Sequence, residues 1–122
     1  MRDTFLPEVK LMRTLIQSID FPLTKALKTF ILCHAEKNAL LHTERVKSVI
    51  VRLKDLNGPK GGADKQCIVE VQLSNLPPIV VKRCSLDAYA SARHALARAS
   101  RIVNRRLGRQ RAARLSVTST PN

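Results

Sequence analysis

The chain has 122 residues, 44% apolar and 3% aromatic, which is enough for a single domain with an aliphatic core. Its 22 lysines and arginines against nine acidic residues give a formal net charge of +13, which favours a polyanionic partner. No stretch is apolar enough to span or anchor in a membrane, and the first twenty residues lack the apolar centre of a secretory signal. We therefore expect a cytoplasmic protein that binds nucleic acid.

A strand and a helix are predicted after an N-terminal arm of seven residues. Residues 9–19 form the expected strand, although its alternation is imperfect. Turn residues and Pro22 then precede apolar side chains at helical spacing, which predicts a helix over residues 22–41. The N-cap of this helix is either Asp20 or Thr24.

Three more strands are predicted next. Segments 45–56 and 65–76 alternate apolar and polar side chains, so each strand should bury one face and expose the other. Pro77 and Pro78 are expected to turn the chain before a last strand over residues 79–84. The residues expected on the buried faces are Val49, Val51, Leu53, Cys67, Val69, Val71 and Leu73.

A long helix is predicted to close the domain, with Asp87 as its N-cap. Gly108 is expected to mark where this helix frays or ends. Residues 115–122 are polar and are expected to form a disordered tail, which leaves 1–114 as one domain. The prediction is an α+β fold of order β-α-β-β-β-α, with a mostly antiparallel four-stranded sheet and two helices on one face.

Cys33, Cys67 and Cys84 are odd in number and widely spaced. Their spacing is not that of a zinc site, even if His34 or His42 were recruited. We expect reduced thiols that serve as small core residues, with no metal and no cofactor. No grouping of nucleophile, base and carboxylate is found either, so an enzyme is not expected.

The basic residues gather on the predicted second helix, where positions 93–114 hold eight arginines and no acidic residue. At about 100° per residue, four of them share one side with His94, away from the apolar side. Like charges three or four residues apart on a helix destabilise it by about 0.2–0.5 kcal/mol per pair. A role in phosphate binding therefore explains this row of arginines better than a helix face that is merely exposed to solvent. Because aromatic residues are few, we expect recognition of RNA backbone and shape rather than base stacking. The four residues are Arg98, Arg101, Arg105 and Arg109.

The segment DLNGPKGGADKQC, from Asp55 to Cys67, joins the two central strands and contains three glycines and two lysines. Its free backbone amides could approach phosphate oxygens, with Lys60 and Lys65 adding charge. The alternative to phosphate binding is that the segment is only a flexible connection between the two strands. The segment lacks the Gly-Lys-Ser/Thr ending of a P-loop, and its GPKG run joins strands rather than the helices of a KH domain.

Two stretches resemble the short form of the hibernation-promoting factor family, also called ribosome-associated inhibitor or sigma-54 modulation protein. They are RLKDLNGPKGGADKQCIVEVQL and VVKRCSLDAYASARHALARASRIVNRRLGRQR. The upstream segment FPLTKALKTFILCHAEKNALLHTERVKSVIVRL is similar to the first helix and second strand of that family, so the resemblance covers about residues 16–111. Its most specific part is the pattern D-x-NGP-x-GG-x-DK-x-C.

This resemblance implies a fold similar to double-stranded-RNA-binding domains and binding to ribosomal RNA of the small subunit, near the mRNA and tRNA channel. It implies ribosome hibernation under stress or in stationary phase, by steric inhibition of translation and without a small-molecule substrate. We expect a monomer off the ribosome, because nothing resembles the dimerisation domain of the long form. The implied RNA contacts, with two cations from the second strand added, are Arg98, Arg101, Arg105, Arg109, Lys60, Lys65, Lys82, Arg83, Arg52 and Lys54.

Two other functions are compatible with the sequence. A general RNA or nucleoid protein could use the same basic helix. A regulator of transcription that binds another protein is the third possibility, but such a protein has no need of an acid-free row of arginines.

Overall fold

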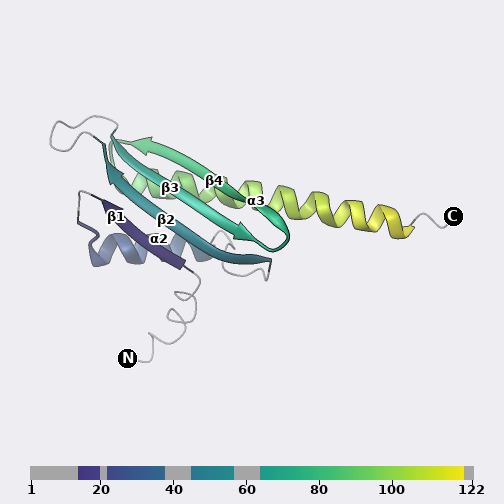
Figure 1. Ribbon diagram of the computed structural model, residues 1–122. Coiled ribbons are helices and arrows are strands. Elements are labelled where there is room, and N and C mark those ends of the chain that lie inside the picture. The colour runs from purple at the N-terminus through teal and green to yellow at the C-terminus, as the bar shows by residue number, and fades with distance from the viewer. Residues whose placement is uncertain (1–13, 20–21, 38–44, 57–63, 120–122) are drawn as a thin grey trace, which may run out of the picture.

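The computed structural model describes residues 14–19, 22–37, 45–56 and 64–119, with side chains described as far as Arg109. Six elements follow in the predicted order β-α-β-β-β-α (Figure 1). The sheet has the order β1-β2-β3-β4, with β1 parallel to β2 and the other neighbours antiparallel. The elements are β1 (Thr14–Ile19), α2 (Lys25–Lys37), β2 (Val46–Asp55), β3 (Lys65–Leu73), β4 (Leu76–Ser85) and α3 (Ala88–Ser119).

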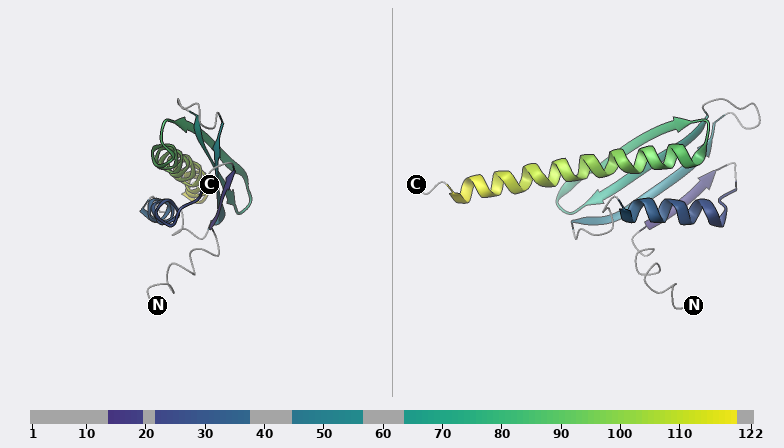
Figure 2. Two further views of the ribbon diagram at one scale, coloured as in Figure 1. Left: turned by 90° about the vertical axis from the view of Figure 1, so that its left-hand side faces the viewer. Right: turned by 180° about the vertical axis from the view of Figure 1, so that it is seen from behind.

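Both helices lie on one face of the sheet, and no described element covers the other face (Figure 2). Alternate side chains of the strands point beneath the helices, because successive residues of a strand face opposite ways. The strand residues predicted for the core are all buried, which confirms the predicted faces of β2 and β3. The helices complete the core with Leu27, Ile31, Ala35, Ala92, Ala95, Leu96, Ala99, Val103 and Leu107.

Thr24 is the N-cap of α2. Its Oγ1 accepts a hydrogen bond of 3.1 Å from the backbone N–H of Leu27, three residues further on. This contact satisfies one of the unpaired amides of the first turn. It decides between the two predicted caps, although Asp20 itself lies outside the described residues. The predicted extension of α2 over residues 38–41 also lies outside them.

The turn before β4 lies three residues earlier than predicted. Leu73 pairs with Leu76, so Ser74 and Asn75 form the connection, and Asn75 adopts a left-handed φ of 61°. Asparagine is one of the few residues that adopt this conformation readily. Pro77 and Pro78 belong to β4 instead of turning the chain. They are tolerated there because β4 lies at the edge of the sheet and has a ladder partner on one side only.

Gly108 was predicted to mark where α3 frays or ends, and it does not end the helix. The helix continues to Ser119, past the start of the predicted tail at residue 115, and residues 120–122 lie outside the described part. A glycine inside a helix costs only about 1 kcal/mol relative to alanine, and the residues around Gly108 are good helix formers. The predicted N-cap is confirmed, since both carboxylate oxygens of Asp87 accept backbone N–H groups at 3.3 Å, from Tyr89 and Ala90.

Only one cysteine, Cys67, lies in the core. Cys33 and Cys84 are exposed, so the prediction that all three serve as core residues is wrong for these two. Cys33 lies on the side of α2 away from its buried residues. Cys84 lies opposite Gln66 on the face of the sheet that carries no helix, which we call the open face. Within the described residues no three His, Cys, Asp or Glu side chains group as metal ligands, and no helix there has the length and apolar character needed to cross a membrane.

The cysteines should differ sharply in reactivity. Burial raises the pKa of the Cys67 thiol to about 12, so almost none of it is the nucleophilic thiolate near neutral pH. We expect iodoacetamide at pH 8 to modify Cys33 and Cys84 in the folded protein and Cys67 only after denaturation. Intact mass spectrometry should therefore show two adducts under native conditions and three in guanidinium. Three adducts on the native protein would contradict a closed core around Cys67.

Candidate nucleic-acid interface

The four arginines predicted to bind phosphate form one exposed face of α3. Arg98, Arg101, Arg105 and Arg109 all face solvent, as does His94. Their opposite side holds the buried alanines and aliphatic residues that pack on β3 and β4, and this packing fixes the rotation of the helix. Among the described residues none of the four forms an ion pair. We call these four residues the arginine face; it spans about 16 Å along the helix at 1.5 Å per residue.

Arg106 has a different role from the arginine face, although it lies next to Arg105 in sequence. It is half-buried on the side of α3 that turns toward the sheet, and its Nη1 donates a hydrogen bond of 2.8 Å to the carbonyl oxygen of Pro77. This contact ties the helix to the start of β4. The arginines of α3 whose side chains are described therefore divide into those that face solvent and one, Arg106, that helps to hold the helix in place.

The cations predicted on the strands lie on both faces of the sheet. Arg83 is opposite the buried Cys67, on the face that carries the helices, whereas Lys82 is opposite Ile68 on the open face. Arg52 and Lys54 also lie on the open face, by their register with β3. A single RNA surface that contacts the helices therefore cannot also contact Lys82, Arg52 and Lys54.

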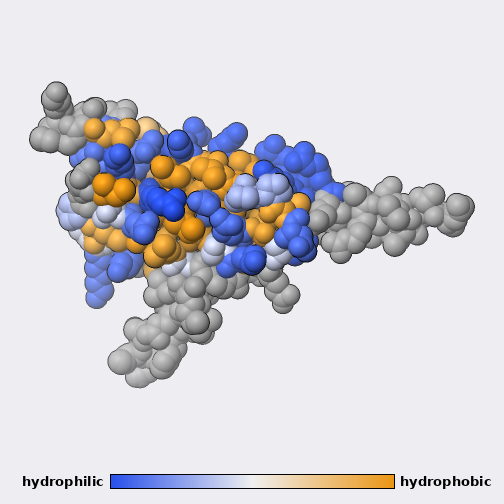
Figure 3. Space-filling model, in the orientation of Figure 1, coloured by the Kyte–Doolittle hydropathy of each residue, from blue (hydrophilic) through white to orange (hydrophobic). Residues whose placement is uncertain are grey.

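The open face is chemically mixed, with hydrophobic and hydrophilic residues interspersed (Figure 3). Leu15, Ile19 and Val80 are about half exposed there. Arg52 is partly neutralised on this face, since its Nη1 lies 3.4 Å from Oε1 of Glu70 and its Nε donates to Gln17 Oε1 at 3.3 Å. These features make the open face a weaker candidate for phosphate binding than the arginine face.

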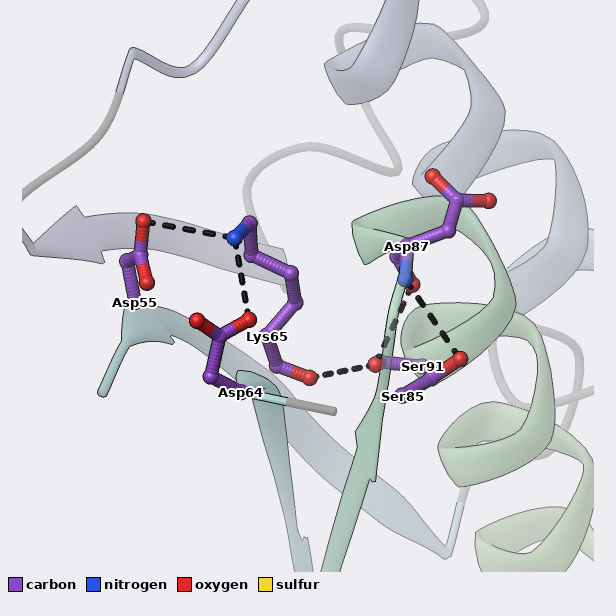
Figure 4. A network of polar contacts seen from close by, with 6 residues as sticks. All are labelled: Asp55, Asp64, Lys65, Ser85, Asp87 and Ser91. Carbon is purple, nitrogen blue, oxygen red and sulfur yellow. Dashed lines mark hydrogen bonds and ion pairs between the residues drawn. The ribbon is translucent and has the colours of Figure 1, made fainter. Parts of the chain in front are cut away.

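Lys65 lies between two carboxylates at the base of the loop that joins β2 to β3. Its Nζ lies 3.0 Å from Oδ1 of the fully buried Asp64 and 3.4 Å from Oδ2 of Asp55 (Figure 4). The hydrogen bond to Asp64, with the added charge of Asp55, raises the pKa of Lys65, so it stays protonated. Its charge is already matched, which leaves it poorly placed as a phosphate contact. Lys60 lies outside the described residues.

This charged cluster connects the loop base to the first turn of α3. The backbone N–H of Leu56 donates to the carbonyl oxygen of Asp64 at 2.9 Å and closes the strand pair. The hydroxyl of Ser91 in α3 lies 2.5 Å from the carbonyl oxygen of Lys65 and 3.2 Å from that of Asp87 (Figure 4). The loop base and the start of the arginine-bearing helix are therefore joined directly. Sequence analysis missed this role of Lys65, although two aspartates flanking the loop were a signal for it.

Comparison with solved structures supports the fold. The chain is similar to a ribosomal subunit interface protein from Coxiella burnetii, with a TM-score of 0.63 at 9% sequence identity over 78% of this chain and 97% of that one. It is also similar to the N-terminal domain of Protein Y from Thermus thermophilus, with a TM-score of 0.60 at 16% identity over 74% and 92%. No protein-family model matches the sequence, and no curated protein matches it. The predicted α+β fold is thus confirmed.

Proposed function

We propose that this chain is a ribosome-associated hibernation factor that binds the small ribosomal subunit near the mRNA and tRNA channel and inhibits translation. The observation that carries the proposal is the exposed arginine face, free of ion pairs within the described residues, on a fold shared with a ribosomal subunit interface protein. The resemblance of the loop and last helix to the hibernation-promoting factor family supports the same function. We infer a cytoplasmic, non-enzymatic factor that acts under stress or in stationary phase.

The mechanism would be steric and electrostatic. Each guanidinium of the arginine face can hold a phosphate through two parallel hydrogen bonds, and binding releases the counterions condensed on the RNA. Arg83 faces the same side of the sheet as the helices and can add to this contact. Once bound, the domain would occupy space that mRNA and tRNA need. The proposal does not depend on Lys65 or on the cations of the open face.

Sedimentation tests this function directly. A stationary-phase lysate is separated on a sucrose gradient, and the fractions are probed for this chain. We expect the chain to migrate with small subunits or whole ribosomes, and purified small subunits to bind it more tightly than purified large subunits. A position only at the top of the gradient would count against the proposal. Equal binding to total RNA and to small subunits would favour a general RNA-binding protein instead.

The loop over residues 57–63 should supply a second phosphate contact. These residues lie outside the described part, but the strand pair around them closes at Leu56 and Asp64. We expect an Asn-Gly turn in their place to preserve the fold and weaken ribosome binding, because Lys60 and the free amides are lost. Each neutralised phosphate contributes about 0.7–0.9 to the slope of log affinity against log salt, so the slope should become shallower by roughly one unit. An unchanged slope would mean that the loop only connects the strands.

A further inference from the structure

The open face of the sheet carries more apolar side chains than contact with water explains. When one face of an antiparallel sheet packs on a core, the residues that alternate to the other face are usually polar. Here aliphatic side chains occupy that face on all four strands. They are Leu15 and Ile19 of β1, Ile50 of β2, Ile68 of β3 and Val80 of β4.

Four of these side chains form a band that crosses the sheet. Leu15 pairs directly with Ile50, and the register of β2, β3 and β4 places Ile50, Ile68 and Val80 diagonally after one another. Leu15 and Val80, at the two ends, are about half exposed, whereas Ile50 and Ile68 are half-buried between them. We call these four residues the apolar band. Hydrophobic residues are visible across the middle of this face in Figure 3.

The open face also has an excess of positive charge. Lys54 and Lys82 are exposed there and form no ion pair within the described residues. Glu70 is the only acidic residue on this face of the described strands, and Arg52 already pairs with it at 3.4 Å. A second copy of the chain would bring the same cations to the interface and be repelled. Charge complementarity therefore favours an acidic partner.

The chemistry of the apolar band favours a protein over RNA as that partner. Sheets that bind single-stranded RNA stack its bases on aromatic side chains, and none of the four strands contains an aromatic residue. Aliphatic side chains instead pack well against other aliphatic side chains. An amphipathic helix with acidic residues beside its apolar stripe supplies both kinds of contact.

We propose that the open face of the sheet docks an amphipathic helix of a partner protein. The apolar stripe of that helix lies on the apolar band, and its acidic residues pair with Lys54 and Lys82. The arginine face belongs to α3, on the other side of the sheet, so the two surfaces can be occupied at the same time (Figure 2). The inference goes beyond the proposed function and does not depend on it.

Cys84 provides the measurement, because it is exposed on the open face and lies diagonally from Ile68. Cys33 is exposed on α2 and serves as an internal control. The probe is a synthetic helical peptide of about 18 residues, or five turns, with leucine along one side and glutamate elsewhere. The control peptide has lysine in place of each glutamate. Alkylation of each cysteine by iodoacetamide is followed by peptide mass spectrometry.

The acidic peptide should protect Cys84 alone. At a peptide concentration of about ten times its Kd, we expect alkylation of Cys84 to slow by about tenfold, with Cys33 unchanged. The lysine peptide should protect neither cysteine. Absence of protection by the acidic peptide at up to about 1 mM, or equal protection by both peptides, would overturn the inference. Because no ribosome is present, failure of the proposed function in the gradient experiment is a separate result.

Two variants with the same change in net charge locate the contact. Lys54→Glu with Lys82→Glu should lose the protection of Cys84, whereas Arg101→Glu with Arg105→Glu should keep it. Equal effects of the two variants, or unchanged protection in a folded Lys54→Glu, Lys82→Glu protein, would overturn the inference. If that variant does not fold, the comparison of the two peptides on the wild-type protein decides alone.

The same assay identifies other occupants of the open face. Protection of Cys84 by a ten-nucleotide RNA and not by the acidic peptide would assign the face to RNA. Protection that grows with protein concentration, without any peptide, would assign it to a second copy. Protection that is lost on removal of residues 1–13 would assign it to the chain's own N-terminal segment. Each of these three results would overturn the inference.

Discussion

Replacement of Arg101 and Arg105 together by glutamate should abolish ribosome association and leave the fold intact. Both side chains are exposed on the arginine face and form no ion pair within the described residues, so folding does not need their charge. Each hydrogen bond to a charged group contributes about 1.5–3 kcal/mol, and the new carboxylates would also repel phosphate. We expect affinity for small subunits to fall by roughly 100-fold or more. Pelleting with purified subunits measures the loss, and circular dichroism checks the fold.

The control for this variant must carry the same change in charge elsewhere. Lys54→Glu with Lys82→Glu also lowers the net charge from +13 to +9, but both side chains are exposed on the open face of the sheet. We expect this control to retain most of the affinity. Equal losses in the two variants would show that net charge, rather than the arginine face, drives binding. Wild-type binding by a folded arginine variant would place the interface on another surface.

Lys65→Met should destabilise the fold more than the loss of any exposed lysine. The side chain of Asp64 is completely buried, and its Oδ2 has no hydrogen-bond partner among the described residues. Removal of Lys65 would leave a buried carboxylate without its cation, which is among the most costly defects that one substitution can make. We expect the melting temperature to fall by roughly 5–10 °C, as measured by circular dichroism or calorimetry.

The same pair can be tested for coupling. Addition of Asp64→Asn to Lys65→Met should recover part of the lost melting temperature, because the amide needs no cation. Lys54→Met, which removes an exposed lysine from the neighbouring strand, should change the melting temperature little. A Lys65→Met protein as stable as the wild type, but with weaker ribosome binding, would return Lys65 to the set of phosphate contacts.

Much of the fold could be predicted from local pattern, and the errors have identifiable physical causes. Strict alternation identified the buried faces of β2 and β3, because burial of one face imposes a period of two. The turn before β4 was misplaced because prolines are more prominent turn signals than asparagine, although an edge strand accepts them. The end of α3 was misplaced because one glycine weakens a helix without ending it. Cys33 and Cys84 were assigned to the core on residue type alone.

The candidate interface was predictable to a smaller extent. Helical periodicity placed the arginine face correctly on the solvent side of α3. The same alternation that predicted the strands also requires Lys82 and Arg83 to face opposite ways, so their separation could have been inferred from sequence. The ion pairs of Lys65 and the contact of Phe30 with Tyr89 depend on tertiary packing. The contact of Phe30 with Tyr89 joins residues distant in sequence and has no local signature, whereas the two aspartates that flank the loop were a signal for the ion pairs of Lys65.

The length of α3 has a consequence for how firmly its arginines are held. The helix has 32 residues, or about 48 Å at 1.5 Å per residue, and it projects past the sheet (Figure 1). In its first half the side facing the sheet is buried, with Ala92, Ala95, Leu96, Ala99 and Val103. Amide protons there should exchange with solvent as slowly as those of the central strands, whereas those after Leu107 should exchange early. The backbone at Arg98, Arg101 and Arg105 is therefore fixed before any ligand arrives, so binding costs side-chain entropy but little backbone entropy. Arg109 lies just after Leu107, the last buried residue described in this helix, so its backbone should be less firmly held than that of the other three arginines.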